Sequence, residues 1–151
     1  MKLPYLIDLI AVGVFAVSGC LAAGRKSLDW VGVLVIAVVT AIGGGTVRDL
    51  LLNRHPLYWT VDPHFLYVIV GAVIFTIAYV RFRSPPDRAL LVVDAIGLSI
   101  YAIVGTQIAE DLGRPAAIAV VMGTLTGTAG GVIRDMLVND IPILFREGYL
   151  Y

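Results

Sequence analysis

The chain has 151 residues, of which 59% are hydrophobic and only 15% are charged, and its formal net charge is zero. A mean hydropathy of +0.91 lies far above that of water-soluble domains, so the composition predicts an integral membrane protein. Balanced charge without a long basic run excludes a nucleic-acid partner. The single cysteine, Cys20, excludes an intramolecular disulfide, and two histidines in one loop are too few for a metal centre.

Five apolar stretches follow one another along the chain, and each is long enough, or nearly so, to cross about 30 Å of hydrocarbon as a helix of roughly 20 residues. They run over residues 4–24, 30–52, 65–82, 89–109 and 115–138. The segments between them are too short to hold a soluble domain. The sequence therefore predicts an all-α polytopic membrane helix bundle, in which the first stretch is retained because further apolar stretches follow it.

Basic residues near the ends of these stretches are unequally distributed. The first and third loops carry Arg25, Lys26, Arg81, Arg83 and Arg88, whereas the amino terminus and the second and fourth loops carry Lys2, Arg54 and Arg114. By the positive-inside rule, the first and third loops face the cytoplasm and the amino terminus lies outside.

The chain contains an internal repeat, because a shift of 86 residues aligns the first two stretches with the fourth and fifth without a gap. Since each unit holds three spans, the second copy enters the membrane upside down. We expect a single transmembrane domain of inverted three-helix repeats, about 4–84 and 89–151, the second truncated before its third helix. The shift places Phe65 on Tyr151, so we expect at least one more helix in the intact protein. Identical pairs include Asp8 and Asp94, Gly19 and Gly105, Thr40 and Thr126, Arg48 and Arg134, Asp49 and Asp135, and Asn53 and Asn139.

Adjacent glycines lie about fifteen residues into the second and fifth spans, at 43–45 and 130–131. Glycine costs about 1 kcal/mol relative to alanine inside a helix, and freed backbone groups in a membrane persist only where protein or a wet cavity receives them. Duplicated glycines followed by charges therefore predict broken helices that line a cavity; close packing of two helices is the alternative. The candidate hinge and pore residues are Gly43, Gly44, Gly45, Gly130, Gly131, Thr40 and Thr126.

Arg48 and Arg134 follow the glycines by about four residues, and an ionisable group inside a membrane costs at least about 2.5 kcal/mol. Both arginines should therefore point into the bundle. Because neighbouring helix residues diverge by about 100°, we expect ion pairs that cross between the repeats, Arg48 with Asp135 and Arg134 with Asp49. These charges form either a gate in a pore or a structural lock between the repeats.

Asp8 and Asp94 form another symmetric pair, within a turn or two of the amino ends of their helices. The helix macrodipole favours an anion there, so both residues could simply stabilise helix ends. Alternatively, they form a vestibule that attracts cations. Five hydroxyls could replace ion hydration or bond within their own helices: those of Ser18, Thr40, Thr46, Thr126 and Thr128.

The sequence lacks the residue patterns of an enzyme. Neither nucleotide-binding glycine spacing is present, no serine or cysteine has a histidine within plausible reach, and no carboxylate–histidine cluster could hold a metal. We therefore expect no catalytic activity and no cofactor.

The duplicated glycine-glycine-x-x-arginine-aspartate segments, together with residues 18–26 and 94–97, resemble the prokaryotic branch of the TRIC family, the trimeric intracellular cation channels. The resemblance implies a seven-helix protomer in the prokaryotic inner membrane and a homotrimer with one pore inside each protomer. It also implies kinked second and fifth helices, potassium and sodium as permeant ions, and Arg48 and Arg134 near the constriction. Bacterial relatives are often labelled a glycine transporter domain.

Three functions remain open from the sequence. The first is a passive cation pore whose arginines are neutralised by their aspartates and displaced on opening. The second is a carrier for a small zwitterion such as glycine, with its carboxylate against an arginine and its amine against an aspartate. The third is a structural scaffold, against which the paired intramembrane charges argue.

Overall fold

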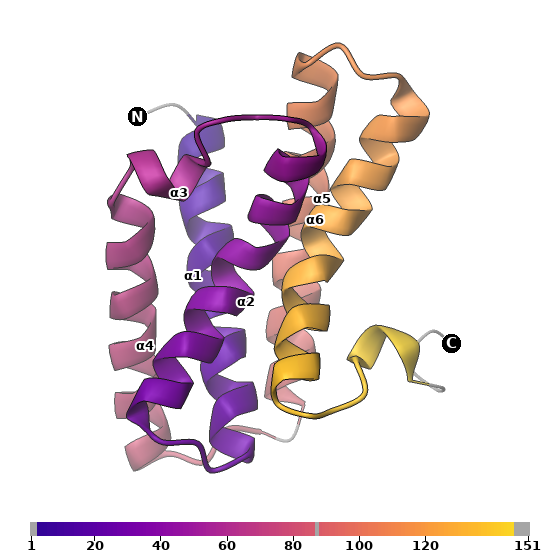
Figure 1. Cartoon of the computed structure of the whole chain (residues 1–151). Helices are drawn as coiled ribbons and strands as arrows, with labels where there is room; N and C mark the ends of the chain where they lie inside the picture. Colours follow the sequence, from indigo (N-terminus) through magenta and orange to yellow (C-terminus); the bar gives the residue numbers. More distant parts are fainter. Residues whose placement is uncertain (1–2, 87, 147–151) are drawn as a thin grey trace.

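The computed structural model describes residues 3–86 and 88–146, which form helices joined by short loops (Figure 1). Two short helices, α3 (Tyr58–Val61) and the 3-10 helix η1 (Ile143–Phe145), lie in the segments after α2 and α6. The predicted all-α bundle is confirmed, and its long helices begin and end within two residues of the predicted stretches, whereas α3 was not predicted. The long helices are α1 (Leu3–Arg25), α2 (Trp30–Leu51), α4 (His64–Phe82), α5 (Ala89–Asp111) and α6 (Ala116–Leu137).

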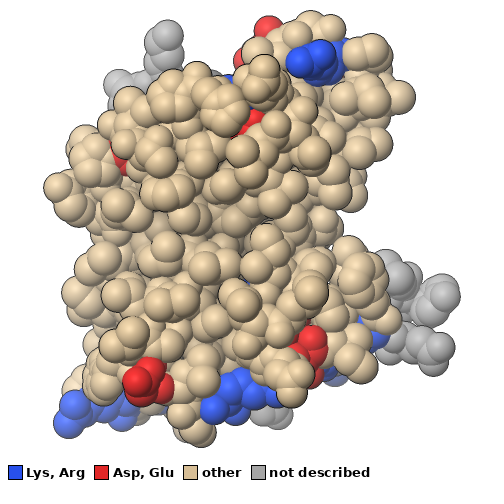
Figure 2. All heavy atoms as spheres, in the orientation of Figure 1, with Lys and Arg blue, Asp and Glu red and all other residues tan. Residues whose placement is uncertain are grey.

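The surface of the bundle matches a membrane environment. All five long helices are long and apolar enough to cross a membrane. On the face shown in Figure 2, charged side chains gather toward the two ends of the molecule and leave an uncharged belt between them. Large apolar side chains such as Ile74 and Phe75 are 64% and 68% exposed, which water would disfavour and lipid accommodates. The chain is an integral membrane protein.

Successive long helices run in alternate directions, so that α5 runs opposite to α1 and α6 runs opposite to α2 (Figure 1). The first helix, α1, packs against α2, α4 and α5, and α2 also packs against α6. Ala11, Ala16 and Ala23 on α1 are fully buried, because small side chains let membrane helices approach closely. The opposite directions are those that an inverted repeat requires; the bounds of the two repeats stay a prediction.

Helix-end geometry recurs at the same shift of 86 residues. Asn53 and Asn139 both have a φ of 54°, and Ser27 and Gly113, which also correspond, have φ angles of 54° and 69°. Left-handed residues of this kind end a helix and turn the chain away. After each asparagine, the next backbone N–H donates to the carbonyl oxygen five residues earlier at 2.8 Å. The sequence repeat is thus matched by a repeat of local structure.

The corner between α3 and α4 is held by Asp62, which lies outside the spans. The Tyr5 hydroxyl donates to Asp62 Oδ2 at 2.5 Å, and the backbone N–H of His64 donates to Oδ1 at 3.0 Å. These hydrogen bonds, above all the one from Tyr5, lower the pKa of Asp62 to about 2. The corner therefore ties the beginning of α4 to α1.

Candidate functional site

The duplicated glycines lie where α2 crosses α6. A Cβ atom on Gly44 would lie 2.1 Å from the carbonyl oxygen of Thr126, and one on Gly130 would lie 2.4 Å from the carbonyl oxygen of Thr40. Both helices are continuous through their glycines. Instead of the predicted break, the structure shows backbones in direct contact, because only glycine leaves room for this approach.

The threonines at the crossing are fully buried. The Thr40 hydroxyl donates to the carbonyl oxygen of Ile36 and the Thr126 hydroxyl to that of Met122, each at 2.6 Å. Both hydroxyls therefore donate to carbonyl oxygens of their own helices, which is the alternative to a role in replacing ion hydration. Gly43 is less crowded, since an added Cβ would meet Ile133 Cδ1 at 3.4 Å.

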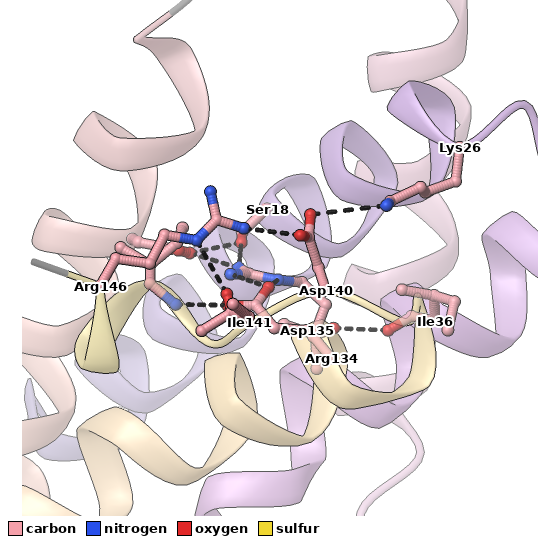
Figure 3. A network of polar contacts seen from close by, with 11 residues as sticks. Ser18, Lys26, Ile36, Arg134, Asp135, Asp140, Ile141 and Arg146 are labelled. Atoms are coloured by element: carbon pink, nitrogen blue, oxygen red, sulfur yellow. Dashed lines mark hydrogen bonds and ion pairs between the residues drawn. The ribbon is translucent and has the colours of Figure 1, made fainter.

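The second arginine site consists of Arg134, Asp135, Asp94 and Ser18, and Figure 3 labels Arg134, Asp135 and Ser18. Arg134 is fully buried; its Nε donates to Asp135 Oδ1 at 2.8 Å and its Nη1 donates to Asp94 Oδ1 at 2.6 Å. The Ser18 hydroxyl accepts from Arg134 Nη1 and donates to the same Asp94 oxygen. The other Asp135 oxygen accepts from the backbone N–H of Ile143 at 2.9 Å. The Arg134 guanidinium therefore joins α6 to α1 and α5, and the Asp135 carboxylate joins α6 to η1.

The first arginine site consists of Arg48, Asp49, Asp8 and Tyr58. Arg48 and Asp49 are fully buried, and Arg48 Nε donates to Asp49 Oδ1 at 2.8 Å. The guanidinium carbon of Arg48 lies 5.6 Å from the centre of the Tyr58 ring, and Asp8 lies within electrostatic reach of both charges. Arg54, which is 43% exposed, approaches Asp49 Oδ1 at 3.5 Å from the loop after α2.

The two sites differ in how completely their polar atoms are paired. Within the described part of the chain, buried Asp8 Oδ1, Arg48 Nη1, Asp49 Oδ2 and the Tyr58 hydroxyl have no hydrogen-bond partner. Arg48 Nη2 contacts Asp49 Oδ1 at 2.8 Å, and Arg134 Nη2 contacts Asp135 Oδ1 at 2.7 Å, both without a well-directed hydrogen bond. At the second site, Arg134 Nη2 is the one buried polar atom of the described residues that lacks a hydrogen-bond partner. The first site thus contains polar groups that protein atoms do not satisfy.

The predicted ion pairs between the repeats are wrong. Arg48 pairs with Asp49, and Arg134 pairs with Asp135, the residue next to each in sequence. The prediction used the directions in which helix side chains leave the backbone, but a long arginine side chain can curve until its guanidinium reaches the adjacent carboxylate. Arg134 instead contacts the first repeat through Ser18.

Both arginines lie in the last turn of their helices rather than near the middle of the span. A cation there is favoured by the helix macrodipole. Because α2 and α6 run in opposite directions, the first and second arginine sites lie toward opposite ends of the bundle, on either side of the glycine crossing (Figure 1). The expectation that both arginines point inward is met, since neither is exposed.

A cavity of about 330 Å³ adjoins the second arginine site, lined by Asp94, Arg134, Asp135 and Gly131 together with apolar residues of α5, α6 and η1. In the first repeat, Gly45 corresponds to Gly131, and the Tyr58 ring fills the space beside it. A Cβ on Gly45 would lie 2.7 Å from this ring. On Gly131 the nearest atom would be Arg134 Nη2, at 3.8 Å. The second site is therefore well paired but open, and the first is covered by Tyr58.

Asp94 serves neither as a helix cap nor as a free vestibule carboxylate, because it bonds to side chains of α6 and α1. Asp8 has one buried oxygen without a partner among the described residues. The sequence analysis did not identify Tyr58, which begins the short helix α3, where no periodic pattern marks it. Ser18 was considered only as a hydroxyl of the first span, although its position opposite the second repeat gives it two charged partners.

The comparisons with known proteins agree on one family. A family model described as Glycine transporter matches residues 5–81 and again 91–151, and the second match begins where the shift of the repeat places residue 5. A TRIC trimeric intracellular cation channel orthologue from Rhodobacter sphaeroides superposes with a TM-score of 0.91 at 36% identity, over 97% of this chain and 76% of that one. The chain belongs to the prokaryotic TRIC family.

Other TRIC relatives support the same assignment. The UPF0126 inner membrane protein YadS of Escherichia coli is 43% identical over 145 residues, which are 95% of this chain and 70% of the relative. A UPF0126 membrane protein of Vibrio cholerae is 45% identical over 149 residues, 97% of this chain and 62% of that protein. A structure described as showing the basis for conductance through TRIC cation channels matches with a TM-score of 0.81 at 34% identity, over 98% of this chain and 73% of that one. The resemblance seen in the sequence is confirmed, and membership of a channel family agrees with the expectation that the chain is not an enzyme.

Proposed function

We propose that this chain conducts monovalent cations, potassium and sodium, across the prokaryotic inner membrane. The solved relatives are described as cation channels, and the Escherichia coli relative is named an inner membrane protein. The observation that carries the proposal is the pair of buried arginine–aspartate sites on either side of the glycine crossing. A pathway between them would run inside one protomer, along α2 and α6.

Buried charges are unfavourable in a bundle that has only a structural role. Each costs a few kcal/mol between membrane helices, and replacing a buried ion pair with apolar residues is often neutral or stabilising. Arg48 and Arg134 are nevertheless fully buried and paired. Their retention favours a function for the charges, and ionisable groups inside a membrane commonly line ion pathways.

The geometry supports a closed state held by ion pairs. A guanidinium in the pathway repels a cation, whereas Asp8 and Asp49 at the first site attract it. The unpartnered oxygens of these two carboxylates could replace water around a passing cation once Arg48 has moved. We infer that opening separates α2 from α6 at Gly44 and Gly130, the point where the backbones touch.

We further propose a homotrimer with one pathway in each protomer and with the amino terminus outside. The trimer is proposed because a relative is described as trimeric. The orientation is proposed because exposed arginines and a lysine lie at the end of the bundle where α1 and α4 finish, and the positive-inside rule places that end in the cytoplasm.

A carrier for a small zwitterion such as glycine is the second candidate. The cavity of about 330 Å³ at the second arginine site brings a guanidinium and two carboxylates together, and the matching family model carries the description Glycine transporter. Against this function, the guanidinium already bonds to both carboxylates and to Ser18.

Ion flux and solute uptake separate the two candidates. The chain would be reconstituted in liposomes loaded with potassium chloride, and potassium efflux would be compared with uptake of radiolabelled glycine. The channel proposal expects rapid efflux that is reduced several-fold by Asp49→Asn, because this change removes a carboxylate from the pathway. Saturable glycine uptake without ion flux would instead establish the carrier.

A further inference from the structure

An apolar cavity of about 410 Å³ lies at the basic end of the bundle, apart from both arginine sites. It lies where several elements converge: the carboxyl ends of α1 and α4, the beginnings of α2 and α5, and the loop at Pro85 and Pro86. Its volume falls in the range of roughly 300–1,000 Å³ that is typical of sites for small molecules. Its apolar lining includes Cys20, Leu21, Val33, Ile77, Val80 and Leu90.

Aromatic residues indicate the depth of this cavity in the membrane. Trp30 and Phe82 lie at the same end of the bundle and are 71% and 82% exposed. Exposed aromatic residues at the ends of membrane helices mark the boundary between hydrocarbon and headgroups. The cavity extends from this boundary along α1 and α4 to Cys20 and Thr76, and therefore lies at the depth of lipid acyl chains.

The rim of the cavity is basic. Arg25 contributes to its lining, and three further arginines are exposed nearby: Arg81 in the last turn of α4, and Arg83 and Arg88 in the segment between α4 and α5. Figure 2 shows Lys and Arg gathered along this end of the molecule. A basic pocket between membrane helices on the cytoplasmic side is suited to an anionic lipid headgroup.

We propose that this cavity binds one acyl chain of an anionic phospholipid, whose headgroup lies against Arg25 and the neighbouring arginines. The apolar volume accounts for the chain, and the basic rim accounts for the negative headgroup. A soluble anion would leave the apolar lining empty, and a zwitterionic lipid would bring no net negative charge to the basic rim. The site is separate from the proposed pathway and does not depend on conduction.

Two glycines provide a matched test of the cavity. A Cβ on Gly24, which lines the cavity, or on Gly71, which lies on α4 outside it, would meet no atom within 4 Å. Leucine should therefore fit at either position, but only Gly24→Leu fills the cavity. In native mass spectrometry, we expect the wild type and Gly71→Leu to retain phosphatidylglycerol several-fold better than phosphatidylcholine with the same chains, and Gly24→Leu to lose this preference. Equal retention by Gly24→Leu and the wild type would overturn the proposal.

The basic rim is tested with a second pair of variants and a thiol reporter. Arg25→Gln should weaken the preference for phosphatidylglycerol, whereas Arg114→Gln at the opposite end should leave it unchanged. Cys20, the single cysteine, lines the cavity, so phosphatidylglycerol should slow its alkylation by N-ethylmaleimide several-fold more than phosphatidylcholine does. Equal protection by both lipids would contradict an anionic site. Neither readout involves ion flux, so the outcome is independent of the proposed channel function.

Discussion

The two arginine sites occupy equivalent positions in the repeat and are chemically different. Both place an arginine beside its neighbouring aspartate with an Nε–Oδ1 distance of 2.8 Å. At the second site, Ser18 and Asp94 accept further hydrogen bonds from Arg134, whereas the first site leaves several buried polar atoms without partners among the described residues. The comparison shows that duplication preserves backbone geometry while a few side chains decide how firmly each arginine is held.

The differences trace to three pairs of corresponding positions. Ser18 corresponds to Val104, so the first site has no equivalent hydroxyl. Tyr58 corresponds to Leu144, and the tyrosine covers the first site. Arg54, which approaches Asp49, corresponds to Asp140, which pairs instead with Lys26 at 3.6 Å and Arg146 at 2.7 Å (Figure 3). We infer that the second site is the fixed anchor of the bundle and the first is the mobile gate.

The largest expected effect is on the anchor. Arg134→Met leaves the buried Asp135 and the half-buried Asp94 without their cation, and removal of one partner from a buried ion pair typically costs about 3–5 kcal/mol. We expect a large fall in the thermal unfolding temperature in detergent. Arg48→Met should cost less, because Arg54 remains near Asp49. Equal destabilisation by the two variants would contradict the distinction between anchor and gate.

Removal of the Ser18 hydroxyl isolates one difference between the sites. This hydroxyl bonds to both Arg134 and Asp94, and a hydrogen bond to a charged group contributes about 1.5–3 kcal/mol. Ser18→Ala should therefore lower the free energy of unfolding by about that amount, measured by denaturant titration in micelles. Ser99→Ala is the control, since that hydroxyl bonds only to a carbonyl of its own helix. A loss no larger than in the control would mean that Arg134 does not need the hydroxyl.

The glycine crossing tests the part of the molecule where the repeats are alike. Ala at Gly44 or Gly130 would place a methyl group against a carbonyl oxygen of the opposite helix, and such overpacking costs about 1–3 kcal/mol. The two variants should have similar unfolding temperatures, both below the wild type. Gly43→Ala, whose Cβ has room, should be nearly neutral. Unequal effects at Gly44 and Gly130 would show that the crossing is not symmetric.

The smallest expected effect comes from making the first site resemble the second. Val104→Ser places a hydroxyl where the repeat positions Ser18, and this hydroxyl should give Arg48 an additional partner. If Arg48 is the mobile gate, potassium efflux from liposomes should fall by roughly fivefold, since about 1 kcal/mol corresponds to that change in an equilibrium constant. Val104→Ala serves as the control for lost volume. An unchanged flux would mean that Arg48 does not limit conduction.

Much of the fold could be predicted from sequence. Apolar runs give the long helices, and the 86-residue shift gives their opposite directions, because an odd number of spans inverts the second copy. The pairing of the arginines could not be predicted, since helix periodicity describes where a side chain begins rather than where a long guanidinium ends. The covering role of Tyr58 depends on the short helix α3, which no periodic pattern marks.

The glycines illustrate a similar limit. The sequence favours a broken helix over a tight crossing, but adjacent glycines are compatible with both, because both need a missing side chain. The distinction depends on whether another backbone approaches, which is a tertiary property. Gly44 contacts the backbone of α6, Gly130 contacts the backbone of α2, and both helices remain continuous.

Potassium efflux from liposomes, compared between the wild type and Arg48→Gln, tests the gating account most directly. The account predicts rapid efflux from the wild type and severalfold faster efflux from Arg48→Gln, because glutamine removes the charge that repels cations while Asp8 and Asp49 remain. Arg146→Gln at the surface should match the wild type. If neither the wild type nor Arg48→Gln conducts potassium while both are folded, the proposed cation pathway through the first arginine site is contradicted.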